Sequence, residues 1–209
     1  MNAKREDADR LARYRGRRDF SRTSEPSGGA AADGHRPRFV VQLHDASRMH
    51  FDFRLEADGV LKSWAVPKGP STDPQDKRLA MPTEDHPLDY RDFEGVIAEG
   101  EYGAGTVIIW DEGTYEEAEP VDGGLERGHL SFRLNGRKLR GDWALTRFRR
   151  ASRDGRGEAW LLVKRANSRG GAANSRQGTP DPARARSART GRTLRQVAHD
   201  ENGKHSRGS

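Results

Sequence analysis

Two histidines, an aspartate and an arginine lie close together in residues 44–56, HDASRMHFDFRLE. From His50 onward polar and apolar residues alternate, which is the pattern of a β-strand whose successive side chains point to opposite faces. One face would carry His50, Asp52 and Arg54, and the other would carry apolar residues for a core. If a neighbouring strand brings His44 to the same face, two imidazoles and one carboxylate form a three-ligand site with open positions, as in catalytic metal sites.

The arginine extends this site toward phosphate chemistry. Arg54 continues the polar face, and a guanidinium can hold a phosphate through two parallel hydrogen bonds. A metal in such a site lowers the pKa of bound water and stabilises charge on phosphoryl oxygens. Mixed nitrogen and oxygen ligands suit either manganese or zinc. The alternative is that these histidines are ordinary solvent-facing residues of a strand. That explanation fits a single histidine better than it fits the whole group.

Further polar residues could belong to the same site. Lys68 lies in VPKGP, where two prolines could fix a cation in place, although a routine surface lysine is equally plausible. His86 and Tyr90 lie in TEDHPLDY, whose acidic residues could orient an imidazole, and a histidine near a phosphate can bind the anion or act as a general acid. The glycine-rich segment 99–105 precedes a strand and not a helix, so tight packing at a barrel corner is favoured over phosphate binding.

Composition limits the protein class. Hydrophobic residues make up 32% of the 209 and charged residues 33%, so we expect part of the chain to be disordered. No apolar run approaches the roughly 18 residues of a membrane span, and the N-terminus has no apolar signal region, so we expect a cytoplasmic protein. The lack of cysteine excludes disulfides and thiolate metal sites. The net charge of +6 is uneven, because residues 165–209 hold ten Lys and Arg but only three acids.

The pattern between residues 38 and 164 is that of short strands separated by turns. Glycine turns are expected at Asp58-Gly59, Glu112-Gly113 and Asn135-Gly136, the last of which is a strong two-residue hairpin signal. Strands at this density predict an all-β fold, either a closed antiparallel barrel or a sandwich. Four tryptophans in these strands are expected to pack in the core. The predicted strands are 38–44, 50–56, 60–66, 78–81, 106–110, 113–116, 130–134, 141–147 and 159–164.

Three regions are expected along the chain. Residues 1–34 form a leader with a short helix at about 5–14 and a flexible stretch at 24–34 that could let the helix fold back over the domain. Residues 35–165 form the barrel domain. Residues 166–209 are rich in Gly, Ser, Ala and Arg and contain no aromatic residue, which predicts a disordered basic tail. The tail is either passive or a nonspecific nucleic-acid arm.

Several long motifs occur together in an order that resembles one known family. They are FVVQLHDASRMHFDFRLE at 39–56, LKSWAVPKGP at 61–70, EDHPLDY at 84–90, EGVI at 94–97 and EGEYGAGTV at 99–107. Over roughly residues 18–164 the chain resembles the 3′-phosphoesterase domain of bacterial DNA ligase D, in a free-standing form. The resemblance implies a compact closed antiparallel β-barrel and a manganese-dependent phosphoesterase that heals 3′ ends in nonhomologous end joining. Such enzymes remove a 3′-terminal ribonucleoside to leave a 3′-phosphate, and then remove that phosphate to leave a 3′-hydroxyl.

The resemblance also implies roles for individual residues. The metal ligands are expected to be His44, His50 and Asp52. The residues expected to contact or support the scissile phosphate are Arg54, His86, Gln42, Lys68, Arg78 and Tyr90. Residues expected to serve the ribonucleoside-removing step are Arg18, Asp19 and Glu25. The expected partners are DNA 3′ ends, a Ku-like protein and a separate ATP-dependent ligase, with a monomer as the default.

Two other classes of protein compete with this interpretation. A noncatalytic nucleic-acid or repair-partner module could keep the barrel without turnover, but the ligand and phosphate-contact positions are all present. A zinc-stabilised structural barrel would need a fourth protein ligand, and the sequence offers no obvious one. We therefore expect an enzyme.

Overall fold

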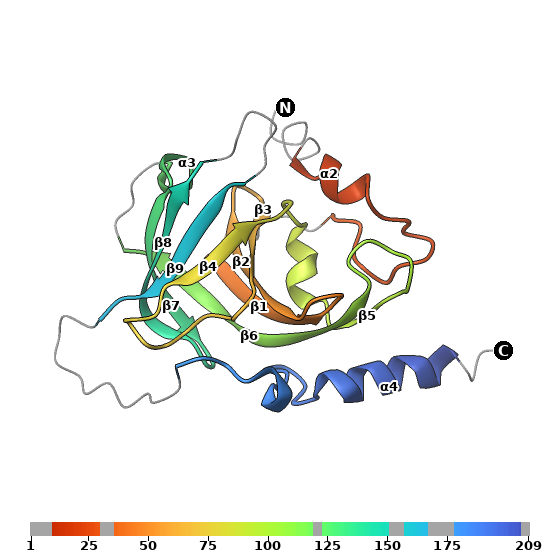
Figure 1. The fold of residues 1–209 in the computed structure, drawn as a ribbon. Coiled ribbons are helices and arrows are strands. Elements are labelled where there is room, and N and C mark those ends of the chain that lie inside the picture. The colour runs from red at the N-terminus through yellow and green to blue at the C-terminus, as the bar shows by residue number, and fades with distance from the viewer. Residues whose placement is uncertain (1–9, 30–35, 119–122, 151–156, 167–177, 206–209) are drawn as a thin grey trace.

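The protein is a closed β-barrel with short helices around it (Figure 1). The structure, a computed structural model, describes residues 10–29, 36–118, 123–150, 157–166 and 178–205. No helix in these ranges is long and apolar enough to cross a bilayer. The strands are β1 (Arg38–Asp45), β2 (His50–Ala57), β3 (Val60–Val66), β4 (Arg78–Pro82), β5 (Gly95–Ile97), β6 (Gly105–Glu117), β7 (His129–Gly136), β8 (Arg140–Arg149) and β9 (Ala159–Lys164). The helices are α2 (Ala12–Arg15), α3 (Gly124–Arg127), α4 (Leu194–His205) and the 3-10 turns η1 (Leu88–Asp92) and η2 (Pro182–Arg184).

Eight antiparallel strands form the ring, which confirms the predicted closed barrel. Their order is β1-β2-β3-β4-β9-β8-β7-β6, and β6 pairs again with β1 to close the sheet. The ninth strand, β5, pairs with the start of β6 outside the ring. Closure leaves no unpaired edge within the ring, which is how such barrels avoid edge-to-edge association.

Apolar side chains fill the barrel, as the strand alternation requires. Every strand of the ring contributes to one buried cluster, which includes Phe53, Phe132, Trp143 and Leu162. Trp64 and Trp160 are also buried there and Trp110 packs against the cluster, so the core role predicted for the tryptophans is confirmed. Because the interior is full, any site for a polar substrate must lie on the outer surface of the sheet.

A second, smaller apolar cluster lies outside the ring. It joins Leu11 and Tyr14 of the leader to Leu61 of β3, to Tyr90 of η1 and to Ile97 of β5. Figure 1 shows α2, η1 and β5 together on one side of the barrel. The leader therefore does fold back over the domain. Residues 24–29 of the expected flexible stretch are held in place, and Glu25 is buried. Residues 5–9 of the expected helix lie outside the described residues.

Two of the expected turns are placed differently by the structure. β6 runs straight through Glu112-Gly113, where glycine is needed because a Cβ on Gly113 would lie 2.3 Å from the backbone oxygen of Asn135 on β7. The β7–β8 hairpin turns two residues after Asn135-Gly136, and the Gly136 amide donates to the carbonyl of Leu139. The buried carboxylate of Asp111 accepts from three successive amides of this turn. The Asp58-Gly59 turn is confirmed, with positive φ at both residues.

The C-terminal segment differs from the expected disordered tail over residues 178–205. The Arg189 guanidinium lies 2.5 Å from Glu112 of β6 and 2.8 Å from Asp92 of η1. The Ala188 amide donates to the carbonyl of Ile109, and Val197 of α4 is buried. The basic composition that suggested disorder instead matches acidic residues on the outside of the barrel. Residues 167–177 and 206–209 of the expected tail lie outside the described residues.

Candidate metal and phosphate site

The hairpin of β1 and β2 creates the predicted polar face. Its register places His44 directly opposite His50 and Gln42 opposite Asp52, so these four side chains share the outer face of the sheet. His44 Nδ1 and His50 Nε2 each lie 3.6 Å from the same carboxylate oxygen of Asp52. Potential ligand atoms of the three residues all lie within 4.8 Å of one another. The His44, His50 and Asp52 set is therefore compact enough to hold one metal ion.

The far nitrogen of each imidazole is held by a backbone carbonyl. His44 Nε2 lies 2.8 Å from the carbonyl oxygen of Gly103, and His50 Nδ1 lies 2.8 Å from that of Arg48. A carbonyl can only accept, so these ring nitrogens carry the protons and the nitrogens facing Asp52 carry lone pairs. Fixing the tautomer by an outer carbonyl is the usual preparation of a metal-binding histidine. The donor set thus fits a divalent cation.

Charge within the triad is consistent with ligand function. Burial opposes ionisation of Asp52, but Arg54 and both histidines outweigh it and hold the pKa of this carboxyl well below its usual range. Burial lowers the pKa of His50, but the protonated imidazole can donate a hydrogen bond to the Asp52 carboxylate and is attracted by its charge, so the net shift of the pKa is upward. The carboxylate is therefore anionic at neutral pH and available as a hard oxygen ligand.

Arg54 is fixed next to the metal ligands by three polar contacts. Its Nη2 lies 3.2 Å from Asp52, its Nε donates to the Gln42 side-chain oxygen at 2.7 Å, and its Nη1 donates to the Ser63 hydroxyl at 2.8 Å. Gln42 is itself held because its amide donates to the carbonyls of Tyr90 and Phe93. The Gln42 side chain therefore reaches the site through Arg54, which agrees with a supporting role.

His86 lies beside Arg54 in the same site. Its backbone pairs with Leu61 of β3, and its ring lies 4.7 Å from that of Tyr90 and 5.1 Å from that of Tyr14. The Nδ1 atom lies 2.9 Å from the carbonyl oxygen of Glu84 and 3.0 Å from Arg54 Nη1. Burial and the positive charge of Arg54 hold the pKa of His86 well below its usual value, so the imidazole is neutral in the free protein.

The acidic residues beside His86 have a different role from the one expected. The Asp85 carboxylate pairs with Lys62, and the Glu84 carboxylate binds two arginines of the leader. It is the backbone carbonyl of Glu84, and not a carboxylate, that orients the imidazole. The hydroxyl of Tyr90 lies in a buried setting that raises its pKa well above the usual value, so it remains protonated.

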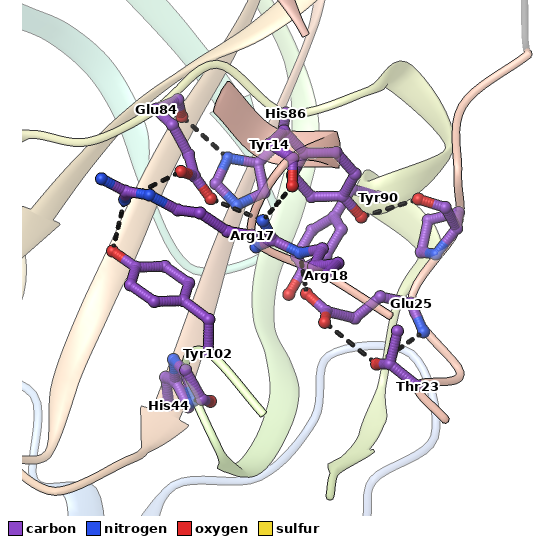
Figure 2. A network of polar contacts seen from close by, with 12 residues as sticks. Tyr14, Arg17, Arg18, Thr23, Glu25, His44, Glu84, His86, Tyr90 and Tyr102 are labelled. Atoms are coloured by element: carbon purple, nitrogen blue, oxygen red, sulfur yellow. Dashed lines mark hydrogen bonds and ion pairs between the residues drawn. The ribbon is translucent and has the colours of Figure 1, made fainter. Parts of the chain in front are cut away.

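Arg18 brings the leader into the site. Figure 2 shows its guanidinium between Glu25 and Glu84, at 2.9 and 2.6 Å, and it stacks 3.7 Å over the ring of Tyr14. All three charged side chains are at most 4% exposed. Burial lowers the pKa of Arg18, but its bonds to Glu84 and Glu25 outweigh burial and raise the pKa above its usual value. The Arg18 side chain is therefore always a cation. Asp19, by contrast, is exposed and accepts from Ser21.

A cavity of about 300 Å³ connects these groups. Of the residues expected at the site, those that line it are Arg18, His44, His50, Asp52, Arg54, His86 and Tyr90. Gln42 and Glu25 lie behind that lining as partners of Arg54 and Arg18. Lys68 is exposed on the turn after β3, and Arg78 bonds to Asp76 and to Thr179 of the C-terminal segment, so neither lines the cavity.

Several residues of the site were not expected from the sequence. Ser63 was predictable, because the Asp58-Gly59 turn fixes a register in which Ser63 lies opposite Arg54. Tyr14, Arg17, Glu84 and Tyr102 had no such signal, since their contacts join segments far apart in the chain.

The antiparallel barrel carries two histidines and one aspartate beside a buried arginine and a neutral histidine. These are the features of a metal-binding phosphoesterase domain. The family described as DNA Ligase D 3′-phosphoesterase domain matches residues 42–147. The chain therefore belongs to this family.

Relatives of known name agree with the family assignment. The chain is 55% identical over 156 residues to the multifunctional non-homologous end joining protein LigD of Pseudomonas aeruginosa, covering 74% of this chain and 18% of that protein. It is 47% identical over 165 residues to the multifunctional non-homologous end joining DNA repair protein LigD of Mycobacterium tuberculosis. That match covers 78% of this chain and 20% of that protein. The LigD of Mycolicibacterium smegmatis is 45% identical over 145 residues, a match that covers 66% of this chain and 19% of that protein. The chain thus spans about a fifth of these relatives.

Proposed function

We propose that this protein is a divalent-metal-dependent hydrolase that repairs DNA 3′ ends. It removes a 3′-terminal ribonucleoside to leave a 3′-phosphate, and then removes this phosphate to leave a 3′-hydroxyl. The main support is the convergence of the His44, His50 and Asp52 triad with Arg54 and His86 in one cavity. Membership of the ligase D phosphoesterase family and the end-joining relatives support the DNA substrate.

The metal is proposed to be manganese, held by His44, His50 and Asp52. When bound, a divalent cation there supplies Lewis acidity, which lowers the pKa of water and stabilises charge on phosphoryl oxygens. The protein offers two nitrogens and one oxygen, which leaves coordination positions for water and substrate. A closed structural zinc site would need a fourth protein ligand, and the described residues form no larger group of His, Cys, Asp and Glu here.

The protein's own residues are proposed to bind the phosphate and to manage one proton. Arg54 holds nonbridging oxygens, because Gln42 and Ser63 fix its guanidinium before substrate arrives. His86 is neutral in the free protein because the charge of Arg54 is close by. A bound phosphate offsets that charge and raises the pKa of His86, so the imidazole can take up a proton and pass it to the leaving oxygen.

The same proposal identifies the partners by their role. A DNA ligase or polymerase needs a 3′-hydroxyl as its substrate, so an ATP-dependent DNA ligase activity is expected to act after this phosphoesterase. A Ku-like protein that holds DNA ends is expected to act before it. The end-joining names of the relatives support a role of this kind, and the two partners themselves are part of the proposal.

The test uses two labelled primer–templates, one ending in a single 3′ ribonucleotide and the other in a 3′-phosphate. Each is incubated with manganese or with a chelator. We expect manganese-dependent conversion of the first primer to a 3′-phosphate and then to a 3′-hydroxyl, and direct conversion of the second. DNA binding without conversion of either primer would instead favour a noncatalytic binding module.

Two variants connect the activity to the site. Asp52→Ala should abolish turnover and also weaken manganese binding measured by calorimetry, because it removes the only carboxylate of the triad. His129→Ala is the control, since His129 is an exposed histidine of β7, a strand that pairs with neither β1 nor β2, and among the described residues its side chain bonds to Thr146 and Ser131. Full activity of Asp52→Ala under manganese would refute the ligand assignment.

A further inference from the structure

Tyr102 is an exposed aromatic residue at the mouth of the site cavity. Five large hydrophobic residues are exposed in the described part of the chain, and Tyr102, at 52%, is the only one of them that lines this cavity. No other aromatic ring of a described residue packs against it. The Tyr102 ring therefore belongs to neither apolar cluster of the described residues and remains open at the cavity.

The backbone fixes Tyr102 relative to the metal ligands. Residues 98–104 form two successive turns, with the Glu101 amide donating to Ala98 and the Ala104 amide donating to Glu101. Gly103, the third residue of the second turn, has a φ of +79°, as a type II turn requires, which leaves Tyr102 at the projecting corner. The carbonyl of Gly103 also holds His44 at 2.8 Å. The ring and a metal ligand are thus joined through one residue.

The leader holds the Tyr102 ring from one side. Arg17 donates to the Tyr102 hydroxyl at 2.8 Å and to Glu84 at 3.0 Å, and its guanidinium lies 4.7 Å from the ring centroid. Figure 2 shows Tyr102 between Arg17 and His44. Glu101 is also tied to the leader by Arg22 at 3.3 Å. A ring oriented in this way, and still half exposed, is prepared for a flat ligand at the cavity mouth.

We propose that Tyr102 is a stacking platform for a nucleobase next to the scissile phosphate. This inference rests on the proposed function, because it assumes a nucleic-acid 3′ end in the cavity. At about 300 Å³ the cavity is at the lower limit of ligand pockets, so only the end of a polynucleotide fits inside and the adjoining base lies at the mouth. Aromatic stacking suits a repair enzyme because every base has a π-face, so the contact tolerates any sequence.

The test is a double-mutant-type cycle, in which Tyr102 is changed in the protein and a base is removed from the primer, separately and together. With the intact 3′-ribonucleotide primer, Tyr102→Ala should raise KM about tenfold and leave kcat nearly unchanged, since stacking contributes to binding before and during reaction. With primers that carry an abasic sugar at the terminal or the penultimate position, the effect should disappear for the position that stacks. Tyr102→Phe keeps the ring and loses only the hydrogen bond from Arg17, so its KM should stay much closer to that of the wild type than the KM of Tyr102→Ala does. Phe148→Ala, which removes an equally exposed aromatic of β8 outside the cavity, is the matched control.

The 3′-phosphate primer separates the two bases that could stack. An effect limited to the ribonucleotide primer identifies the departing nucleoside, and an effect on both primers identifies the retained strand. The inference is overturned if KM does not change, if the effect is equal on abasic primers, or if Tyr102→Phe is as impaired as Tyr102→Ala. Manganese affinity should be unchanged in Tyr102→Ala, because a loss would mean that the variant disturbs His44 and not the base.

Failure of the proposed function is visible separately, as absence of turnover by the wild type. In that case primer binding measured by fluorescence anisotropy in chelator decides the inference. Tyr102→Ala should still weaken binding of the intact primer and not of the abasic one. Equal binding by both proteins would overturn the inference without any reference to catalysis.

Discussion

The buried arginine of the leader offers the sharpest test of how the site is closed. Replacing Arg18 with methionine keeps its length but leaves Glu25 and Glu84 without their main cation. Side chains of all three residues are at most 4% exposed, so the two carboxylates would be left in a setting with little water. Removing one partner of a buried ion pair costs about 3–5 kcal/mol. The leader packs through the small outer cluster and not through the barrel core, so this loss should detach the leader before it unfolds the barrel.

Hydrogen exchange measured by mass spectrometry can separate these outcomes. A loss of about 3 kcal/mol corresponds to at least about a hundredfold faster exchange in peptides from residues 10–29, with little change in β1 to β3. Arg13→Met is the control, because Arg13 is exposed on α2. Adding Glu25→Gln to Arg18→Met should recover part of the protection, since it removes one unpaired charge. Unchanged exchange in the leader of Arg18→Met would refute the claim that this ion network holds the leader in place.

Three other predictions concern separate parts of the molecule. Burial raises the pKa of Glu94, but hydrogen bonds from the C-terminal segment hold it below the ordinary 4.5, so docking of residues 178–201 should be complete above that pH and weaken as pH falls through the folded pKa. Limited proteolysis should show this, and Glu94→Gln should remove the pH dependence. Gly105→Ala should lower stability by about 3 kcal/mol in urea unfolding, because its Cβ would lie 2.1 Å from a β1 carbonyl oxygen at a φ of +143°, whereas Gly29→Ala, with open space, should be neutral. Ser63→Ala should lower kcat/KM about tenfold by freeing one arm of Arg54, and normal kinetics would contradict the positioning role of Ser63.

The metal face was predictable because it depends on local rules. Alternation from His50 to Glu56 assigns residues to faces, and a short β1–β2 connection forces His44 to pair across from His50. The Asp58-Gly59 turn then sets the register of β2 and β3, which places Ser63 opposite Arg54 and so next to the site. Closure of the barrel followed from the resemblance and not from the pattern, since the pairing of β1 with β6 joins segments more than sixty residues apart.

What the sequence did not reveal are the contacts between charges that lie far apart in the chain. Arg18 and Glu84 are 66 residues apart, and nothing in the composition of either segment connects them. The same holds for the C-terminal arginines, because the basic and aromatic-free composition of that segment gives no sign of its ion pairs with the outside of the barrel. Long-range ion pairs have no sequence period, so a charged segment that docks and one that stays solvated look alike.

Contacts set by strand register and contacts set by long-range ion pairs occur in different parts of the protein, namely the barrel and the cover of the site. The barrel supplies the sheet on which His44, His50, Asp52 and Arg54 are placed by backbone register, and strands hold side chains more precisely than loops do. The cover of the site consists of the leader and the turn that carries Tyr102, which meet through Arg17 and buried charges. The leader is also held by the small outer apolar cluster, but that cluster is smaller than the barrel core, so the cover should open at lower cost than the barrel unfolds. Under the proposed function, a 3′ end that loses a nucleoside and returns as a phosphate would meet a fixed face of His44, His50 and Asp52 beneath a cover that is held less firmly than the barrel.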